Sequence, residues 1–287
     1  MSAIFGIIAT PFGYVMQFMY DFIGNYGLCI ILFSLLVKLA TTPLLLKQKK
    51  SMLATQRLQP KIQAIQKKYY NDKNRMNEEM QALYDRENVS PTSGCGTMLI
   101  TMLILLGLYQ VILQPMHFFM HLSNNQINLV IDALKNIIPG YVYDPAARGA
   151  EIQLASLVAD NFDALKAALP NLSLMQIDFN FLGIDLSAVP EFGWNTGLII
   201  PALSGLTAFG ASFLQSKMQE RVNPDAPVPK TGFMMYVVMP AMSLYFCFIL
   251  PAGLGIYWIA NNIFGAASEP LFNYIIKKQK EKESVKS

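Results

Sequence analysis

Charged side chains are scarce in this sequence. Asp, Glu, Lys and Arg make up 14% of the 287 residues, whereas soluble proteins carry about 25%. Hydrophobic residues make up 53% of the chain, and the mean hydropathy is +0.34. This composition argues against an ordinary soluble protein. It predicts an all-α polytopic membrane protein whose length comes from several membrane spans rather than from several soluble domains.

Cysteine and histidine are also rare. The three cysteines, Cys29, Cys95 and Cys247, lie in or beside apolar runs and form no CxxC pair, so we expect neither a disulfide framework nor a zinc site. His117 and His121 have the i, i+4 spacing of a metal pair on a helix. No third ligand lies nearby in the sequence, however, and two interfacial histidines without a metal or cofactor are expected.

One long apolar run, residues 28–46, carries a lysine near its middle. A run of about 20 apolar residues predicts a transmembrane helix. A lysine at that depth costs roughly 2.5–3.5 kcal/mol and usually faces water or a partner. Helical spacing places Ser34, Thr41 and Thr42 on the same face as Lys38. The sequence therefore predicts one hydrated, positively charged wall on this helix.

The rest of the chain divides by composition into further segments. Pro11 and Gly13 are expected to break the first of these. Further spans are predicted at residues 97–120, 194–216, 233–250 and 252–273. On the outer side we predict an interfacial helix at 1–27 and a loop at 121–193 with amphipathic helices over 125–138 and 151–169. On the cytoplasmic side we predict a basic helical hairpin at 47–93, a loop at 217–232 and a basic tail at 274–287.

Charge is distributed unevenly between these segments. Residues 47–93 hold ten Lys or Arg against five acids, and residues 118–193 hold three against eight. Positively charged loops stay in the cytoplasm. Five spans then place the N-terminus outside and the C-terminus in the cytoplasm.

Lys38 has no obvious carboxylate partner in the sequence. The nearest candidates by span, Asp21 and Glu269, are expected near opposite membrane faces. Helix–helix hydrogen bonding could account for polar residues such as Ser204, but not for an unpaired lysine. Ser34 and Lys38 could imitate a Ser–Lys hydrolase dyad, although no oxyanion-hole motif is visible. An ion- or proton-coupled solute transporter is the stronger alternative, although no internal repeat supports it.

Three long motifs resemble the YidC/Oxa/Alb family of membrane protein insertases, in its Gram-positive form. They are GNYGLCIILFSLLVKLATTPLLLKQKKS (24–51), the hairpin and second span at 58–112, and MPAMSLYFCFILPAGLGIYWIANNIFG (239–265). The resemblance implies five spans around a hydrophilic groove that is open to the cytoplasm and the lipid. Bacterial members usually carry arginine at the position of Lys38, so this chain departs from the pattern there.

The resemblance also implies a function. It predicts a non-enzymatic insertase of the bacterial cell membrane that moves short polar segments of small membrane proteins across the bilayer. The implied partners are nascent membrane proteins, the ribosome, the signal recognition particle receptor, the Sec translocon and lipids, with no direct nucleic-acid function. The expected groove residues are Lys38, Ser34, Thr41, Thr42, Gln110, Gln215, Trp258 and Asn262.

Overall fold

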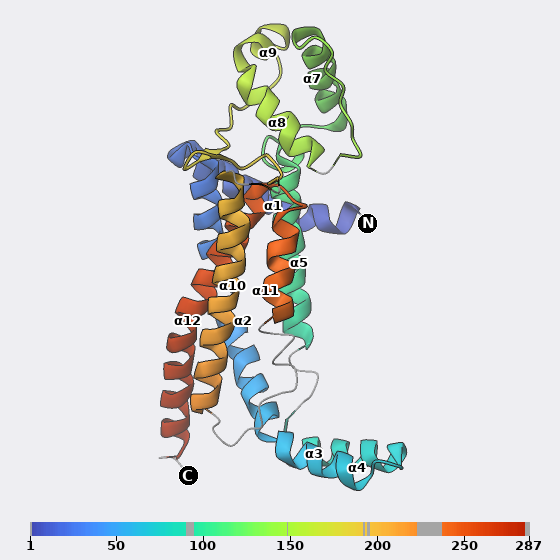
Figure 1. Cartoon of the computed structure of the whole chain (residues 1–287), viewed down its shortest axis with the longest axis vertical. Helices are drawn as coiled ribbons and strands as arrows, with labels where there is room; N and C mark the ends of the chain where they lie inside the picture. Colours follow the sequence, from blue (N-terminus) through green and yellow to red (C-terminus); the bar gives the residue numbers. More distant parts are fainter. Residues whose placement is uncertain are drawn as a thin grey trace.

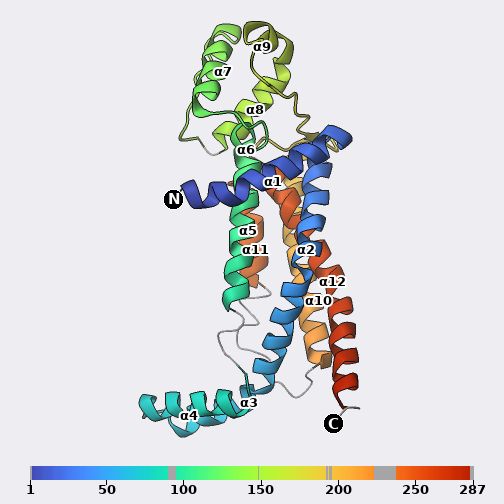
Figure 2. The same ribbon diagram turned by 180° about the vertical axis from the view of Figure 1, so that it is seen from behind.

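A computed structural model describes residues 2–89, 95–147, 149–191, 193, 196–222 and 237–284. The described chain is mostly helical, as predicted. Helices α2 (Tyr26–Arg57), α5 (Cys95–Leu113), α10 (Ile199–Val222), α11 (Met239–Cys247) and α12 (Ala252–Ser284) run along the long axis of the molecule (Figures 1 and 2). Within the described residues, two helical segments, Tyr26–Arg57 and Thr196–Met218, are long and apolar enough to cross a membrane.

One end of this bundle, which we call the cap end, carries the outer loop. Helices α7 (Asn124–Ile137), α8 (Ala150–Asp160) and α9 (Phe162–Ala168) stand above the bundle in Figure 1. The helix expected over 151–169 is therefore two helices. Asn161 separates them: its backbone leaves the helical conformation and its side chain donates a hydrogen bond to the Leu157 carbonyl at 3.0 Å. A short antiparallel hairpin, β1 (Asn180–Phe181) and β2 (Ile184–Asp185), follows.

The opposite end, which we call the hairpin end, carries α3 (Gln59–Lys68) and α4 (Lys73–Arg86). These helices project sideways from the bundle (Figures 1 and 2). They share a small apolar core of Leu58, Ile62 and Leu83. Helix α2 continues well past residue 46, where the apolar run ends, and stops at Arg57. Pro60 follows closely and has no N–H to extend the helix.

Helix α1 (Ser2–Ile23) lies across the bundle near the cap end (Figure 2). Pro11 and Gly13 do not break it, contrary to the expectation from sequence. A Cβ at Gly13 would lie 1.7 Å from the carbonyl oxygen of Phe118 in the short helix α6 (Pro115–Phe118). Glycine is required here because α1 packs directly on the α6 backbone. The interfacial position of α1 in a membrane stays a prediction.

The main hydrophobic core lies at the cap end and joins α1, the start of α2, the end of α5, the cap helices and the start of α12. The segment after β2 also holds the first turn of α12: the carbonyls of Leu186 and Ala188 accept hydrogen bonds from Gly253 and Ala252, each at 2.9 Å. The cap is thus part of the same packed unit as the bundle end beneath it.

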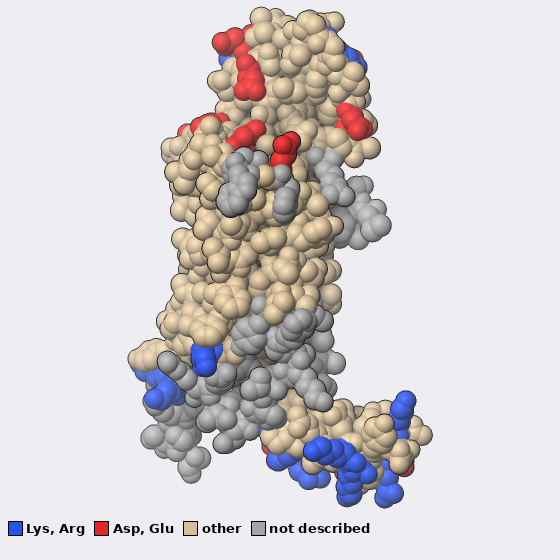
Figure 3. All heavy atoms as spheres, in the orientation of Figure 1, with Lys and Arg blue, Asp and Glu red and all other residues tan. Residues whose placement is uncertain are grey.

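Charge follows the two ends of the molecule. On the face drawn in Figure 3, acidic side chains gather at the cap end and most basic side chains at the hairpin end. Between them lies a broad band with almost no charged atoms. Such a band, flanked by opposite charge, is the pattern expected of a chain that crosses a bilayer.

Candidate functional site

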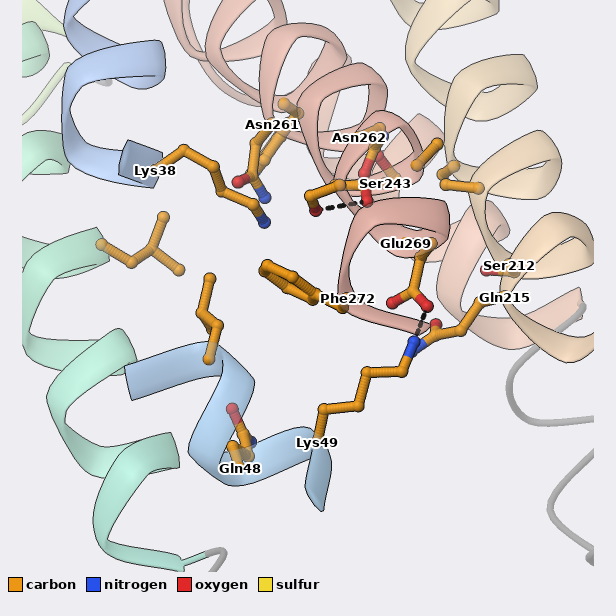
Figure 4. Close-up of a pocket in the computed structure, with 18 of the residues that line it drawn as sticks. Lys38, Gln48, Lys49, Ser212, Gln215, Ser243, Asn261, Asn262, Glu269 and Phe272 are labelled. Atoms are coloured by element: carbon orange, nitrogen blue, oxygen red, sulfur yellow. Dashed lines mark hydrogen bonds and ion pairs between the residues drawn. The ribbon is translucent and has the colours of Figure 1, made fainter. Parts of the chain in front are cut away.

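A cavity of about 580 Å³ opens between α2, α5, α10, α11 and α12, away from the cap-end core. Figure 4 shows how its polar side chains lie. Among the described residues, its lining contains three charged side chains, Lys38, Lys49 and Glu269. Its uncharged polar lining is supplied by Gln48, Ser212, Gln215, Ser243, Asn261, Asn262 and Ser268.

Lys38 reaches from α2 across the cavity towards α12. A Cβ at Gly265 would lie 3.6 Å from its ammonium nitrogen, so the missing side chain leaves room for that group. In Figure 4 the ammonium points towards Asn261. Within the described part of the chain, Lys38 makes neither an ion pair nor a side-chain hydrogen bond through its ammonium. Its ammonium group therefore has no charged partner among the described residues.

Lys49 and Glu269 form an ion pair across the same cavity, joining α2 to α12 (Figure 4). Both side chains are largely buried, with exposed fractions of 10% and 13%. The expectation that Asp21 and Glu269 lie near opposite membrane faces stays a prediction, but Glu269 lies in the same cavity as Lys38. Glu269 lines the cavity one helical turn beyond Gly265, the residue that Lys38 approaches.

Half of the residues predicted for the groove line this cavity. Lys38, Gln215, Trp258 and Asn262 come together there from α2, α10 and α12. The Asn262 amide also donates to the Thr207 hydroxyl on α10 at 3.3 Å. The sequence places Lys38 and Asn262 on polar faces of their helices, whereas the groove roles of Trp258 and Gln215 were implied by the family resemblance; their roles stay predictions.

Ser34, Thr41, Thr42 and Gln110 are absent from the described lining of the cavity. The Ser34 hydroxyl is buried and donates to the Ile30 carbonyl at 2.6 Å. Thr41 and Thr42 donate to the carbonyls of Val37 and Lys38, each at 2.8 Å. These hydroxyls satisfy the backbone of their own helix. The bond made by Ser34 disfavours the Ser–Lys dyad, and a groove role for the other three residues stays a prediction.

Sequence reasoning missed Lys49 as a site residue. It lies 11 residues after Lys38, about three helical turns further along, and so falls on the same face if the helix continues. The apolar run ends at residue 46, which placed Lys49 in a separate basic segment. Recognising that α2 runs unbroken to Arg57 would have assigned Lys49 to the cavity.

The two histidines lie outside the cavity, where the bundle meets the cap. The Nδ1 atom of His117 lies 2.8 Å from a Glu151 carboxylate oxygen, and its Nε2 lies 2.6 Å from the Asn124 amide oxygen. His121 stacks on Tyr14 of α1. The described residues contain no group of three or more His, Cys, Asp or Glu side chains suited to hold a metal ion.

These features define a helical membrane protein with a dry core at one end and a positively charged cavity towards the other. Comparison with known proteins names the class: the sequence profile described as "60Kd inner membrane protein" matches residues 18–282. The chain belongs to this family, which includes the YidC and ALBINO3 proteins. The resemblance found in the sequence motifs is confirmed.

Several curated relatives match over most of the chain. "Membrane protein insertase YidC" of Nitratidesulfovibrio vulgaris (strain DP4) is 29% identical over 92% of this chain and 38% of its own length. The insertase YidC of Granulibacter bethesdensis is 30% identical over the same shares. "Inner membrane protein ALBINO3, chloroplastic" of Arabidopsis thaliana is 28% identical over 92% of this chain and 51% of its own. The chain thus spans about two fifths of the length of its bacterial relatives.

Proposed function

We propose that this chain is a membrane protein insertase that moves short polar segments of small membrane proteins across the bilayer. The observation that carries the proposal is the free Lys38 ammonium in a cavity between helices. Relatives named membrane protein insertase support the same reading. The action is binding and release, so no bond is broken and the chain acts as a chaperone rather than an enzyme.

The proposed orientation places the hairpin end in the cytoplasm and the cap end outside. The basic charge of the hairpin and the acidic charge of the cap support this arrangement (Figure 3). Helices α2, α5, α10, α11 and α12 then serve as the five spans. The cavity would admit a segment from the cytoplasmic side, while the packed core limits leakage at the cap end.

The mechanism rests on partial replacement of water. A translocated segment is polar and often acidic, and an oily bilayer centre would strip its hydration. Lys38 and the cavity amides of Gln215 and Asn262 replace part of that hydration. A carboxylate about 5 Å from the Lys38 ammonium gains roughly 3 kcal/mol at an effective dielectric of 20. This is enough to favour entry without trapping the segment. The apolar helix of the substrate then leaves sideways, driven by its own burial in lipid.

Partners follow from the same proposal. The hairpin α3–α4 offers basic side chains clear of the bundle, which suits contact with the ribosome or the signal recognition particle receptor. Cooperation with the Sec translocon would extend the substrate range to larger proteins. These partners are suggested by the family and by the charge of the hairpin.

The decisive experiment replaces Lys38 in proteoliposomes that contain the purified protein. We expect Lys38→Ala to lose insertion of a substrate with an acidic translocated segment, and Lys38→Arg to keep it, because the positive charge is what the segment requires. Leu39→Ala, one residue away and largely exposed at the outer surface of α2, is the matched control. Protease protection of the translocated segment measures insertion. Equal insertion by Lys38→Ala and the unaltered protein would contradict the proposed role of Lys38, and a lack of insertion by the unaltered protein would contradict the proposed function.

A further inference from the structure

The charged side chains that line the cavity are not balanced. Among its described lining residues, two lysines face one glutamate, and Glu269 is bound to Lys49 rather than to Lys38. Lys38 therefore remains without a carboxylate although one is present in the same cavity. The question is why Glu269 does not neutralise Lys38.

Glu269 is within reach of Lys38 by simple helix geometry. Residues i and i+4 on a helix have Cβ atoms about 6 Å apart, so Glu269 lies one turn from Gly265, which Lys38 approaches closely. Side chains on a helix also lean towards its N-terminus. This direction carries the Glu269 carboxylate towards Gly265 and Lys38. In Figure 4, Lys49 reaches this carboxylate from below, whereas Lys38 lies above and to the left of it, with its ammonium beside Asn261.

We propose that Lys49 is a positioning residue that occupies Glu269 and so keeps Lys38 free for the acidic segment of a substrate. This inference rests on the proposed function and adds a specificity determinant to it. Without Lys49, the largely buried carboxylate of Glu269 needs another cation, because an unpaired charge in such a place is costly. Lys38 is the other cation that lines the cavity among the described residues. A Lys38–Glu269 pair would carry no net charge and would therefore not attract the carboxylates of an incoming segment.

A simpler role must be separated from this one. The Lys49–Glu269 pair could serve only to fasten α2 to α12. In that case removing either partner, or both, would weaken the protein to a similar extent. The positioning role instead predicts that Glu269→Gln restores the insertion that is lost when Lys49 alone is replaced, because a glutamine at position 269 cannot form an ion pair with Lys38.

The experiment therefore compares Lys49→Met, Glu269→Gln and the double variant in the proteoliposome assay, with a substrate whose translocated segment is acidic. We expect Lys49→Met to lower insertion by about tenfold, the scale of a partly buried ion pair. Glu269→Gln should lower insertion much less than Lys49→Met does, because Lys38 stays free as in the unaltered protein. The double variant should recover to within about twofold of it. A substrate with a neutral translocated segment should be indifferent to all three changes.

A second measurement does not depend on insertion. In the purified full chain, the rate at which a water-soluble acylating reagent modifies Lys38 is followed by mass spectrometry. Pairing with Glu269 should slow this modification in Lys49→Met, and Glu269→Gln should restore it in the double variant. Thermal melting of each variant in detergent identifies any change that comes from misfolding, and the double variant shows whether the fold needs the pair.

The outcomes separate this inference from the proposed function. If the unaltered protein inserts no substrate, the proposed function is wrong, and if Lys38→Ala keeps full insertion, the proposed role of Lys38 is wrong; in both cases the Lys38 acylation rates still decide whether Lys49 positions Glu269. If Lys38→Ala loses insertion but Lys49→Met does not, the inference alone is overturned. It is also overturned if the double variant stays as impaired as Lys49→Met, since the pair would then act only as a fastener.

Discussion

Helix α2 behaves as two different helices along its length. Towards the cap end it buries Tyr26, Gly27, Cys29, Ile30, Phe33 and Ser34. From there to Leu53 it has no further buried residue, and this stretch carries Lys38 and Lys49 into the cavity. One continuous helix thus supplies both part of a dry core and the wall of a polar site.

Helix α12 repeats the contrast. Its first residues, 252–257, are all buried, whereas most residues after Ala260 are exposed or half-buried. Both helices are anchored at the cap end and line the cavity further along. The core at the cap end fixes the positions of both helices, so the other end can enclose a cavity without losing the fold.

The largest expected difference between the two ends is in access to water. In a background without native cysteines, Ser212→Cys places a thiol in the cavity lining, and Ser34→Cys places one in the buried part of α2. A charged thiol reagent acts on the thiolate, which forms only where water reaches it. We expect rapid labelling at position 212 from the cytoplasmic side and almost none at position 34.

Phe209→Cys is the matched control for this labelling test. Phe209 lies on α10 only three residues before Ser212, is half exposed and is absent from the cavity lining. It should face lipid and react slowly. Equal labelling at positions 209 and 212 would mean that the cavity is no wetter than the outer surface of α10. Labelling of position 34 would show that water passes the cap-end core.

The next largest difference is in stability. Phe33 is 1% exposed within the cap-end core, whereas Leu39, less than two turns later on α2, is 64% exposed. Removing a buried aromatic ring typically costs about 3–5 kcal/mol, so Phe33→Ala should lower the melting temperature strongly. Leu39→Ala should change it little, because its side chain makes few contacts within the protein. Similar melting temperatures for the two variants in detergent would contradict a core confined to the cap end.

The sequence predicts much of this arrangement and misses specific parts for physical reasons. The pattern of polar residues on apolar helices places Lys38 and Asn262 on polar faces, whereas Gln215 and Trp258 were predicted from the family resemblance. The Lys49–Glu269 pair was not found, because it depends on how α2 and α12 align in space, which periodicity within one helix does not report. The unbroken α1 was missed because the contact of Gly13 with α6 is a tertiary reason for a glycine that resembles a helix breaker.

The smallest expected effect lies at the boundary between the two regions. The Ser204 side chain of α10 is fully buried and shares a hydrogen bond of 2.7 Å with Ser243 of α11, which lines the cavity. Hydrogen bonds between helices in membrane proteins contribute about 0.6 kcal/mol on average. Ser204→Ala and Ser243→Ala should each lower stability by about that amount. The double variant should cost little more than either single variant, because the same bond is lost once.

Ser212→Ala, in the cavity lining but without this bond, is the control and should leave stability unchanged. Additive losses in the double variant would show that the two hydroxyls act independently. In that case, no polar contact between α10 and α11 would mark the boundary between the buried core and the cavity.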